Sequence, residues 1–139
     1  MPASFRFLVG VALLAYTGAL AYVLLTPSGT VPSGLVQDAM SVGARLDAPA
    51  ELLQRSRVEF GLNVLAFVPL SFLGYVLRPS IVVSAWIAGA FAVSMLVEAI
   101  QTTMPERMAT HSDVVANTAG AACGALAAWC LVKVLASKD

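Results

Sequence analysis

Residues that could carry out binding or acid–base chemistry are concentrated in one part of the chain. They are two carboxylates, two amides and a guanidinium: Glu98, Gln101, Arg107, Asp113 and Asn117. A pair of carboxylates can serve as general acid and base, and a guanidinium can hold a phosphate or a carboxylate through two parallel hydrogen bonds. The sequence on both sides is apolar, and a charge at the centre of a bilayer costs about 2.5–3.5 kcal/mol unless it is paired. These side chains must therefore bind a ligand or one another.

These residues do not form a familiar catalytic motif. Glu98, Asp113 and His111, the only histidine, could supply an acid and a base. The sequence, however, has no nucleophile elbow, HExxH motif, phosphate-binding glycine loop or paired-aspartate metal motif. Holding a phosphate or carboxylate with Arg107 needs fewer assumptions than catalysis. We therefore predict no metal site and no cofactor, and we favour a protein that is not an enzyme.

The composition places these polar residues in a membrane protein. Of 139 residues, 59% are hydrophobic and 12% are charged, whereas a soluble domain averages about 45–50% apolar and about 25% charged residues. Eight acidic and eight basic residues give zero net charge without a basic run, so no nucleic-acid partner is expected. The cysteines, Cys123 and Cys130, lie about two helical turns apart in one apolar segment, too far to bridge each other.

Four segments are apolar enough to span a bilayer, which needs about 20 such residues. We predict transmembrane helices over residues 5–25, 58–77, 81–101 and 113–135. Pro69, inside the second segment, is expected to kink it. The first segment carries Ala19-Leu20-Ala21, a pattern that signal peptidase can read, but its apolar run is longer than in a signal peptide, and we expect a retained helix. The predicted fold is an all-α integral membrane bundle of four transmembrane helices, with residues 1–139 forming a single domain.

The loop between the first two spans contains a weak helical pattern. Leu35, Ala39, Val42 and Leu46 recur at helical spacing. The Pro- and Gly-rich stretch TPSGTVPSG precedes them and favours an irregular opening of the loop. We predict a short helix in the middle of the loop that lies in the membrane interface through this apolar face.

The predicted topology brings most of the polar residues to one side of the membrane. Spans joined by short connections run antiparallel, so the start of the second span joins the group and adds Asn63. Gly120 and Gly124 form a GxxxG pair, at which a neighbouring helix can approach closely. We favour packing within the molecule over a homodimer seam, and a homo-oligomer stays an unsupported alternative. A similar small pair, Ala85 and Gly89, favours contact between the third and fourth spans.

Each polar residue also has a purely structural interpretation. Asp113 can be the N-cap of the last span, and Asn117 and Asn63 can join neighbouring helices. A buried pair of Arg107 with Glu98 or Asp113 can lock the bundle without binding a ligand. Binding and fastening stay open as alternatives.

Several motifs occur in a fixed order along the last three spans. They are NVLAFVPLSFLG from Asn63, VEAIQ from Val97, Arg107, and SDVVANTAGAACG from Ser112. Together they resemble the VanZ-like family of small bacterial membrane proteins. The resemblance implies a polar signature near one membrane surface, at Asn63, Glu98, Gln101, Arg107, Asp113 and Asn117, and packing positions at Pro69, Gly120 and Gly124.

The resemblance implies less about activity than about fold. The founding member of the family is associated with low-level resistance to the glycopeptide teicoplanin, but the family has no settled biochemical activity. The acid that usually follows the family's arginine is replaced here by Ala109 or Thr110. A role that needs this extra carboxylate is therefore not expected in this chain.

These features support hypotheses from different functional classes. The first is a non-catalytic binding or accessory protein of the cell envelope, which recognises an anionic headgroup, a lipid-linked precursor or a glycopeptide-type compound through the polar residues. The second is an intramembrane enzyme on a lipid-linked substrate, with Glu98 or Asp113 as general base. The third is a small transporter or channel subunit. Membrane lipid is the expected partner, and a lipid-linked envelope precursor is a candidate ligand.

We expect a multi-pass protein of the plasma (inner) membrane. With both termini inside, the basic residues divide evenly, with Arg6, Arg78, Lys133 and Lys138 inside and Arg45, Arg55, Arg57 and Arg107 outside. The charges of the loops therefore do not decide the orientation. A role in the cell envelope favours the polar residues outside and the termini in the cytoplasm.

Overall fold

The computed structural model describes residues 2–28, 30–104 and 110–137, and all regular secondary structure in these ranges is α-helical. Four helices are long and apolar enough to cross a membrane: α1 (Ala3–Leu25), α3 (Arg55–Leu77), α4 (Val83–Gln101) and α5 (His111–Ala136). A further helix, α2 (Thr30–Arg45), follows α1. The predicted all-α membrane bundle is confirmed.

The helices do not begin where the apolar segments begin. α3 starts at Arg55 and α5 at His111, both earlier than predicted. Hydropathy predicts only the part of a helix that lies in the hydrocarbon region of the bilayer. The helical hydrogen bonds of the backbone can continue past that region into polar residues. At the start of α3, Arg55 Nε and Glu59 Oε1 form an exposed ion pair of 2.8 Å one turn apart, which favours the additional turn. α4 starts later than predicted, at Val83, because Val82 has an extended backbone.

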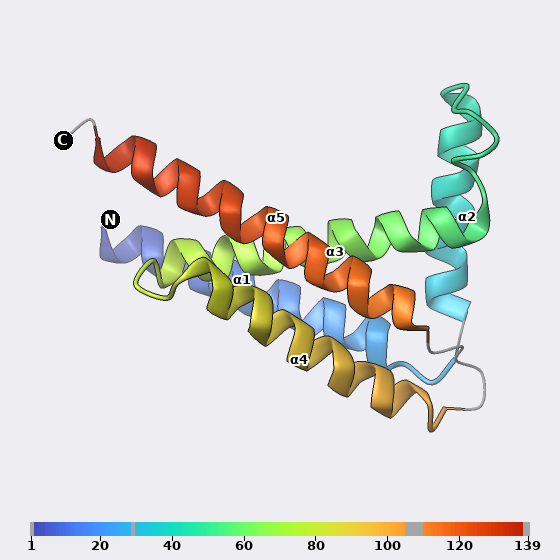
Figure 1. Ribbon diagram of the computed structural model, residues 1–139, viewed down its shortest axis with the longest axis horizontal. Coiled ribbons are helices and arrows are strands. Elements are labelled where there is room, and N and C mark those ends of the chain that lie inside the picture. Colours follow the sequence, from blue (N-terminus) through green and yellow to red (C-terminus); the bar gives the residue numbers. More distant parts are fainter. Residues whose placement is uncertain (1, 29, 105–109, 138–139) are drawn as a thin grey trace.

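The four spans run alongside one another in alternating directions (Figure 1). The start of α1 and the end of α5 lie at one end of the bundle. The end of α1, the start of α3, the end of α4 and the start of α5 lie at the other end, beside α2. This arrangement brings the predicted polar positions that the structure describes to the same end of the molecule.

α3 packs more extensively against α5 than against any other helix. A Cβ atom on Gly120 of α5 would overlap the carbonyl oxygen of Val64, and one on Gly124 would overlap that of Val68. The two backbones approach closely because these positions carry no side chain. α3 continues through Pro69 to Leu77, as lipid-embedded helices with proline do.

α4 packs on α5, but not through the small pair that the sequence suggested. Ala85 and Gly89 are exposed, and no atom lies near the position of a Cβ on Gly89. The buried residues of α4 are instead Ser94, Glu98 and Gln101. A small residue permits a close approach without driving it, whereas a polar side chain facing lipid loses its hydrogen-bond partners.

The helix in the first loop is longer than predicted. α2 begins at Thr30 and includes Pro32 and Gly34, which the sequence assigned to an irregular opening of the loop. Proline is tolerated there because the N–H groups of the first helical turn have no partner within the helix. At its C-terminal end, the helix is shorter than the predicted pattern of apolar residues. That pattern included Leu46, whereas α2 ends at Arg45.

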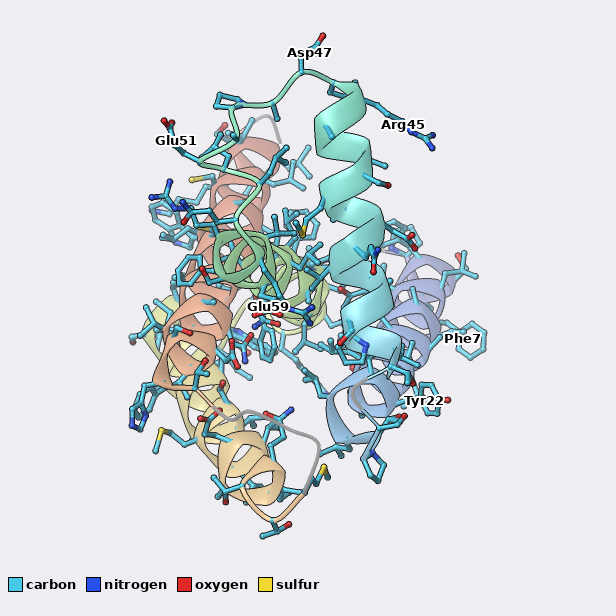
Figure 2. The ribbon with its side chains drawn as sticks, turned by 90° about the vertical axis from the view of Figure 1, so that its right-hand side faces the viewer. Phe7, Tyr22, Arg45, Asp47, Glu51 and Glu59 are labelled. Carbon is cyan, nitrogen blue, oxygen red and sulfur yellow. The ribbon has the colours of Figure 1, made fainter. Side chains whose placement is uncertain are left out.

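α2 crosses the end of the bundle and runs across the direction of the spans (Figures 1 and 2). Val36 is its buried residue, whereas Leu35 and Val42 are about half exposed. Gln37 and Asp38 are exposed as well. An apolar face left uncovered by the protein, with polar residues on another face, is typical of a helix in the membrane interface.

Large apolar side chains cover the outer surface of the spans. Phe7 and Tyr22 of α1 are 71% and 66% exposed and point away from the bundle in Figure 2. Leu14, Leu65 and Leu96 are also largely exposed. Such a surface suits contact with lipid chains and not with water.

Candidate functional site

Side-chain hydrogen bonds join the spans at the end of the bundle beside α2. Asn63 Nδ2 of α3 donates to Asp113 Oδ1 of α5 at 2.8 Å. Asn117 Nδ2 of α5 donates to Ser94 Oγ of α4 at 2.7 Å. Gln101 Nε2 of α4 donates to the carbonyl oxygen of Leu24 in α1 at 2.9 Å. We refer to the side chains at this end as the polar cluster: Asn63, Ser94, Glu98, Gln101, Asp113 and Asn117.

Asp113 is not the N-cap of α5. The helix begins at His111, and its N-cap residue is Thr110, whose side chain forms no capping hydrogen bond. Asp113 therefore lies in the first turn, where the positive end of the helix dipole stabilises a carboxylate. Its Oδ1 atom accepts the bond from Asn63. The capping interpretation failed because α5 extends beyond its apolar part into the preceding polar residues.

Glu98 differs from the other members of the polar cluster because its carboxylate forms no hydrogen bond with the described residues. It is 9% exposed and lies one helical turn from Ser94 on the same face of α4. Within the described parts of the chain, no donor reaches its oxygens. Asp113 and His111 are close enough to act on its charge. Its two oxygens are unpaired but not completely buried. The carboxylate is therefore not fully enclosed by the protein.

Only one of the two polar atoms in the Asn117 side chain has a hydrogen-bond partner among the described residues. Its Nδ2 atom bonds to Ser94, but its Oδ1 atom is buried and has no donor among the described residues. A buried amide oxygen without a partner is costly in a lipid environment. This oxygen is therefore a second acceptor that the described residues leave unpaired.

Arg107 lies outside the described residues, so its predicted pairing with Glu98 or Asp113 is not part of the site described. Gln101 is buried and holds the end of α1. His111 is exposed. Of the predicted binding residues, the structure describes Asn63, Glu98, Gln101, Asp113 and Asn117, which form the polar cluster together with Ser94.

Sequence reasoning missed Ser94 and the Leu24 carbonyl group. Ser94 could have been found, because it lies four residues before Glu98 and so shares its helix face. The Leu24 carbonyl could not, because a backbone acceptor carries no sequence signal. Tyr16 likewise donates from its hydroxyl to the carbonyl oxygen of Ala66 at 2.8 Å and joins α1 to α3.

The residues that the structure describes include no group of three or more His, Cys, Asp or Glu side chains that could hold a metal ion. Cys123 and Cys130 are free and exposed on α5.

The sequence that forms these four spans and the polar cluster was compared with models of known protein families. The model of the VanZ/LLP1 family matches residues 13–133. The chain belongs to the VanZ/LLP1 family. This match confirms the resemblance seen in the sequence and identifies a VanZ-like membrane protein. Comparisons with curated proteins and with solved structures gave no match.

Proposed function

We propose that this VanZ-like protein is a non-catalytic binding or accessory protein of the cell envelope, and that the polar cluster holds the headgroup of a lipid-linked precursor or a related membrane compound. The observation that carries the proposal is Glu98. Its side chain is 9% exposed, and its carboxylate has no hydrogen-bond donor among the described residues but is not fully enclosed.

The chemistry of Glu98 indicates which part of a headgroup it would bind. An ionised carboxylate only accepts hydrogen bonds, so its partner is a hydroxyl, amide or ammonium group. Asn117 Oδ1 needs a donor of the same kind. An anionic part of the ligand, such as a phosphate, is expected to bind Arg107, and this assignment rests on the sequence.

The remaining members of the cluster support a preformed site. The amide N–H groups of Asn63, Gln101 and Asn117 are engaged in contacts between helices. Supporting bonds of this kind hold a binding group in place and lower the cost of ordering it when the ligand arrives. Within one cluster, these N–H groups fasten the helices, while the Glu98 carboxylate and Asn117 Oδ1 have no donor among the described residues.

The location follows from the same proposal. We place the protein in the plasma membrane with the polar cluster at the outer face and both termini in the cytoplasm. A compound of the cell envelope would reach the cluster from that side. α2 would then lie along the outer surface of the membrane, at the same end of the bundle as the cluster.

The proposal is tested by replacing Glu98. The Glu98→Gln variant keeps the size of the side chain but removes its charge. Purification from membranes in a mild detergent, followed by mass spectrometry of co-purifying amphiphiles, should show a loss of about tenfold in bound compound, equal to about 1.4 kcal/mol. Thermal stability in detergent should change little, because the Glu98 carboxylate accepts no hydrogen bond from the described residues.

Glu59→Gln is the matched control. Glu59 lies at the same end of the bundle, but it is exposed and pairs with Arg55. Equal recovery of amphiphile by the two variants would contradict the proposal. Loss of folding in Glu98→Gln would instead assign Glu98 to the fastening of helices.

A further inference from the structure

A cavity of about 410 Å³ opens between α1 and α4. Its walls come from all four spans and include Leu13 of α1, Phe67 of α3, Trp86 and Val93 of α4, and Ala121 of α5. Sites for small molecules typically measure about 300–1,000 Å³. The cavity is therefore large enough to hold part of a ligand.

The lining is predominantly apolar, although the buried indole N–H of Trp86 has no acceptor among the described residues. Its two hydroxyl groups are used within their own helices, since Thr17 Oγ1 donates to the Leu13 carbonyl at 2.7 Å and Ser71 Oγ to the Phe67 carbonyl at 3.1 Å. No charged side chain of the described residues lines the space. Apolar cavities of this kind stay dry and take up apolar guests.

The cavity is open towards the lipid. Ala85, Gly89 and Val93 line it and are exposed, and α1 makes few contacts with α4. Its lining runs along α4 from Ala85 to Val93, a length of roughly 12 Å at 1.5 Å per residue. Because α1 and α4 are membrane spans, what faces this opening is the hydrocarbon region of the bilayer.

One end of the cavity adjoins the polar cluster. Val93 directly precedes Ser94 on α4, and Ala121 lies one turn beyond Asn117 on α5. The other end approaches the start of α4. An apolar space thus continues from the hydrogen-bonded pair of Ser94 and Asn117 towards the middle of the spans.

We propose that this cavity holds the hydrocarbon chain of the same molecule whose headgroup binds at Glu98. The inference rests on the proposed function and narrows it: the ligand is an amphiphile with a chain next to its polar group. A soluble compound without such a chain would leave the cavity unused. The chain enters sideways from the bilayer, between α1 and α4.

Gly89 offers a way to fill the cavity without disturbing the bundle. No atom lies within 4 Å of a Cβ placed on Gly89, so Gly89→Leu can place its side chain in the space. Gly18→Leu on α1 is the matched control, because Gly18 has equally open surroundings and does not line the cavity.

The first test follows the fluorescence of Trp86, which lines the cavity. A Trp129→Phe background leaves Trp86 as the remaining tryptophan. The protein is placed in vesicles of phosphatidylcholine and phosphatidylglycerol whose acyl chains carry bromine, a contact quencher. Trp86 should be quenched, Gly89→Leu should lose most of this quenching, and Gly18→Leu should keep it. Equal quenching in the two variants would overturn the proposal.

The second test measures co-purifying amphiphile, as for Glu98. Gly89→Leu should lower its recovery by about tenfold, equal to about 1.4 kcal/mol, while Gly18→Leu leaves it unchanged. If Glu98→Gln lowers recovery and Gly89→Leu does not, the headgroup site stands and the chain site is wrong. If only Gly89→Leu lowers recovery, the cavity binds a chain but the proposed role of Glu98 fails, and with it the link between the two.

Discussion

Asn117 shows how one side chain can both fasten helices and leave a group unpaired. Its Nδ2 atom ties α5 to Ser94 of α4, while its Oδ1 atom is buried without a donor in the described residues. In lipid, an amide without any hydrogen-bond partner costs on the order of several kcal/mol. The bond to Ser94 therefore explains the position of Asn117, and the buried Oδ1 atom is an acceptor without a donor among the described residues.

The contribution of this bond can be measured with a double-mutant cycle. Asn117→Ala and Ser94→Ala should each lower the free energy of unfolding in mixed micelles. The double variant should lose less than the sum by about 0.6 kcal/mol, the average coupling of polar pairs between membrane helices. Ser94→Ala combined with Thr118→Ala is the control, because Thr118 bonds to Val114 within its own helix. Strict additivity of the Asn117 and Ser94 variants would show that their bond adds nothing.

The sequence predicted which residues gather at one end but not which partners they choose. Asn63, Asp113 and Asn117 could be placed together because antiparallel spans bring the ends of their helices to one side. The choice of Ser94 and of the Leu24 carbonyl depends on how each helix is rotated about its axis. Because the spans are apolar on most faces, their hydropathy does not determine this rotation.

At the level of the helices, the contact between α3 and α5 organises the bundle. Gly120 and Gly124 allow the backbone of α5 to approach the carbonyl groups of Val64 and Val68. Without a hydrophobic effect between helices in lipid, such close packing is a main source of association. The same contact brings Asn63 within reach of Asp113.

Adding a methyl group at this contact tests its importance. Gly120→Ala places a Cβ against the backbone carbonyl of Val64, which cannot move without its helix. The free energy of unfolding should fall by about 1–3 kcal/mol, as for other overpacked sites. Gly18→Ala, whose Cβ meets nothing, should be neutral or slightly stabilising. The outcome that would contradict this packing is equal stability of the two variants in mixed micelles.

The helices themselves were predictable to different degrees. The four spans followed from length and hydropathy, because lipid requires about 20 apolar residues for each crossing. The extent of α2 did not, because Pro32 and Gly34 act as helix breakers in a helix interior but not near a helix start. The pair Ala85 and Gly89 resembled a packing motif, yet these residues line the cavity opening.

For the whole molecule, function depends on which end faces outward. The polar cluster and α2 lie at one end, and the start of α1 and the end of α5 lie at the other. A ligand with a headgroup at Glu98 and a chain in the cavity would be oriented along the spans like a lipid of the adjacent leaflet. The orientation of the protein therefore decides which leaflet supplies the ligand.

Cysteine labelling of intact cells tests this orientation. In a background with Cys123→Ala and Cys130→Ala, Glu51→Cys reports on the end that carries α2, and Ser80→Cys reports on the turn between α3 and α4. Glu51 is preferable to Asp47, whose φ of 53° disfavours most side chains. A membrane-impermeant maleimide should modify Glu51→Cys directly and Ser80→Cys only after permeabilisation. Labelling of Ser80→Cys alone from outside would place the polar cluster at the cytoplasmic face, where an envelope compound could bind only before its export.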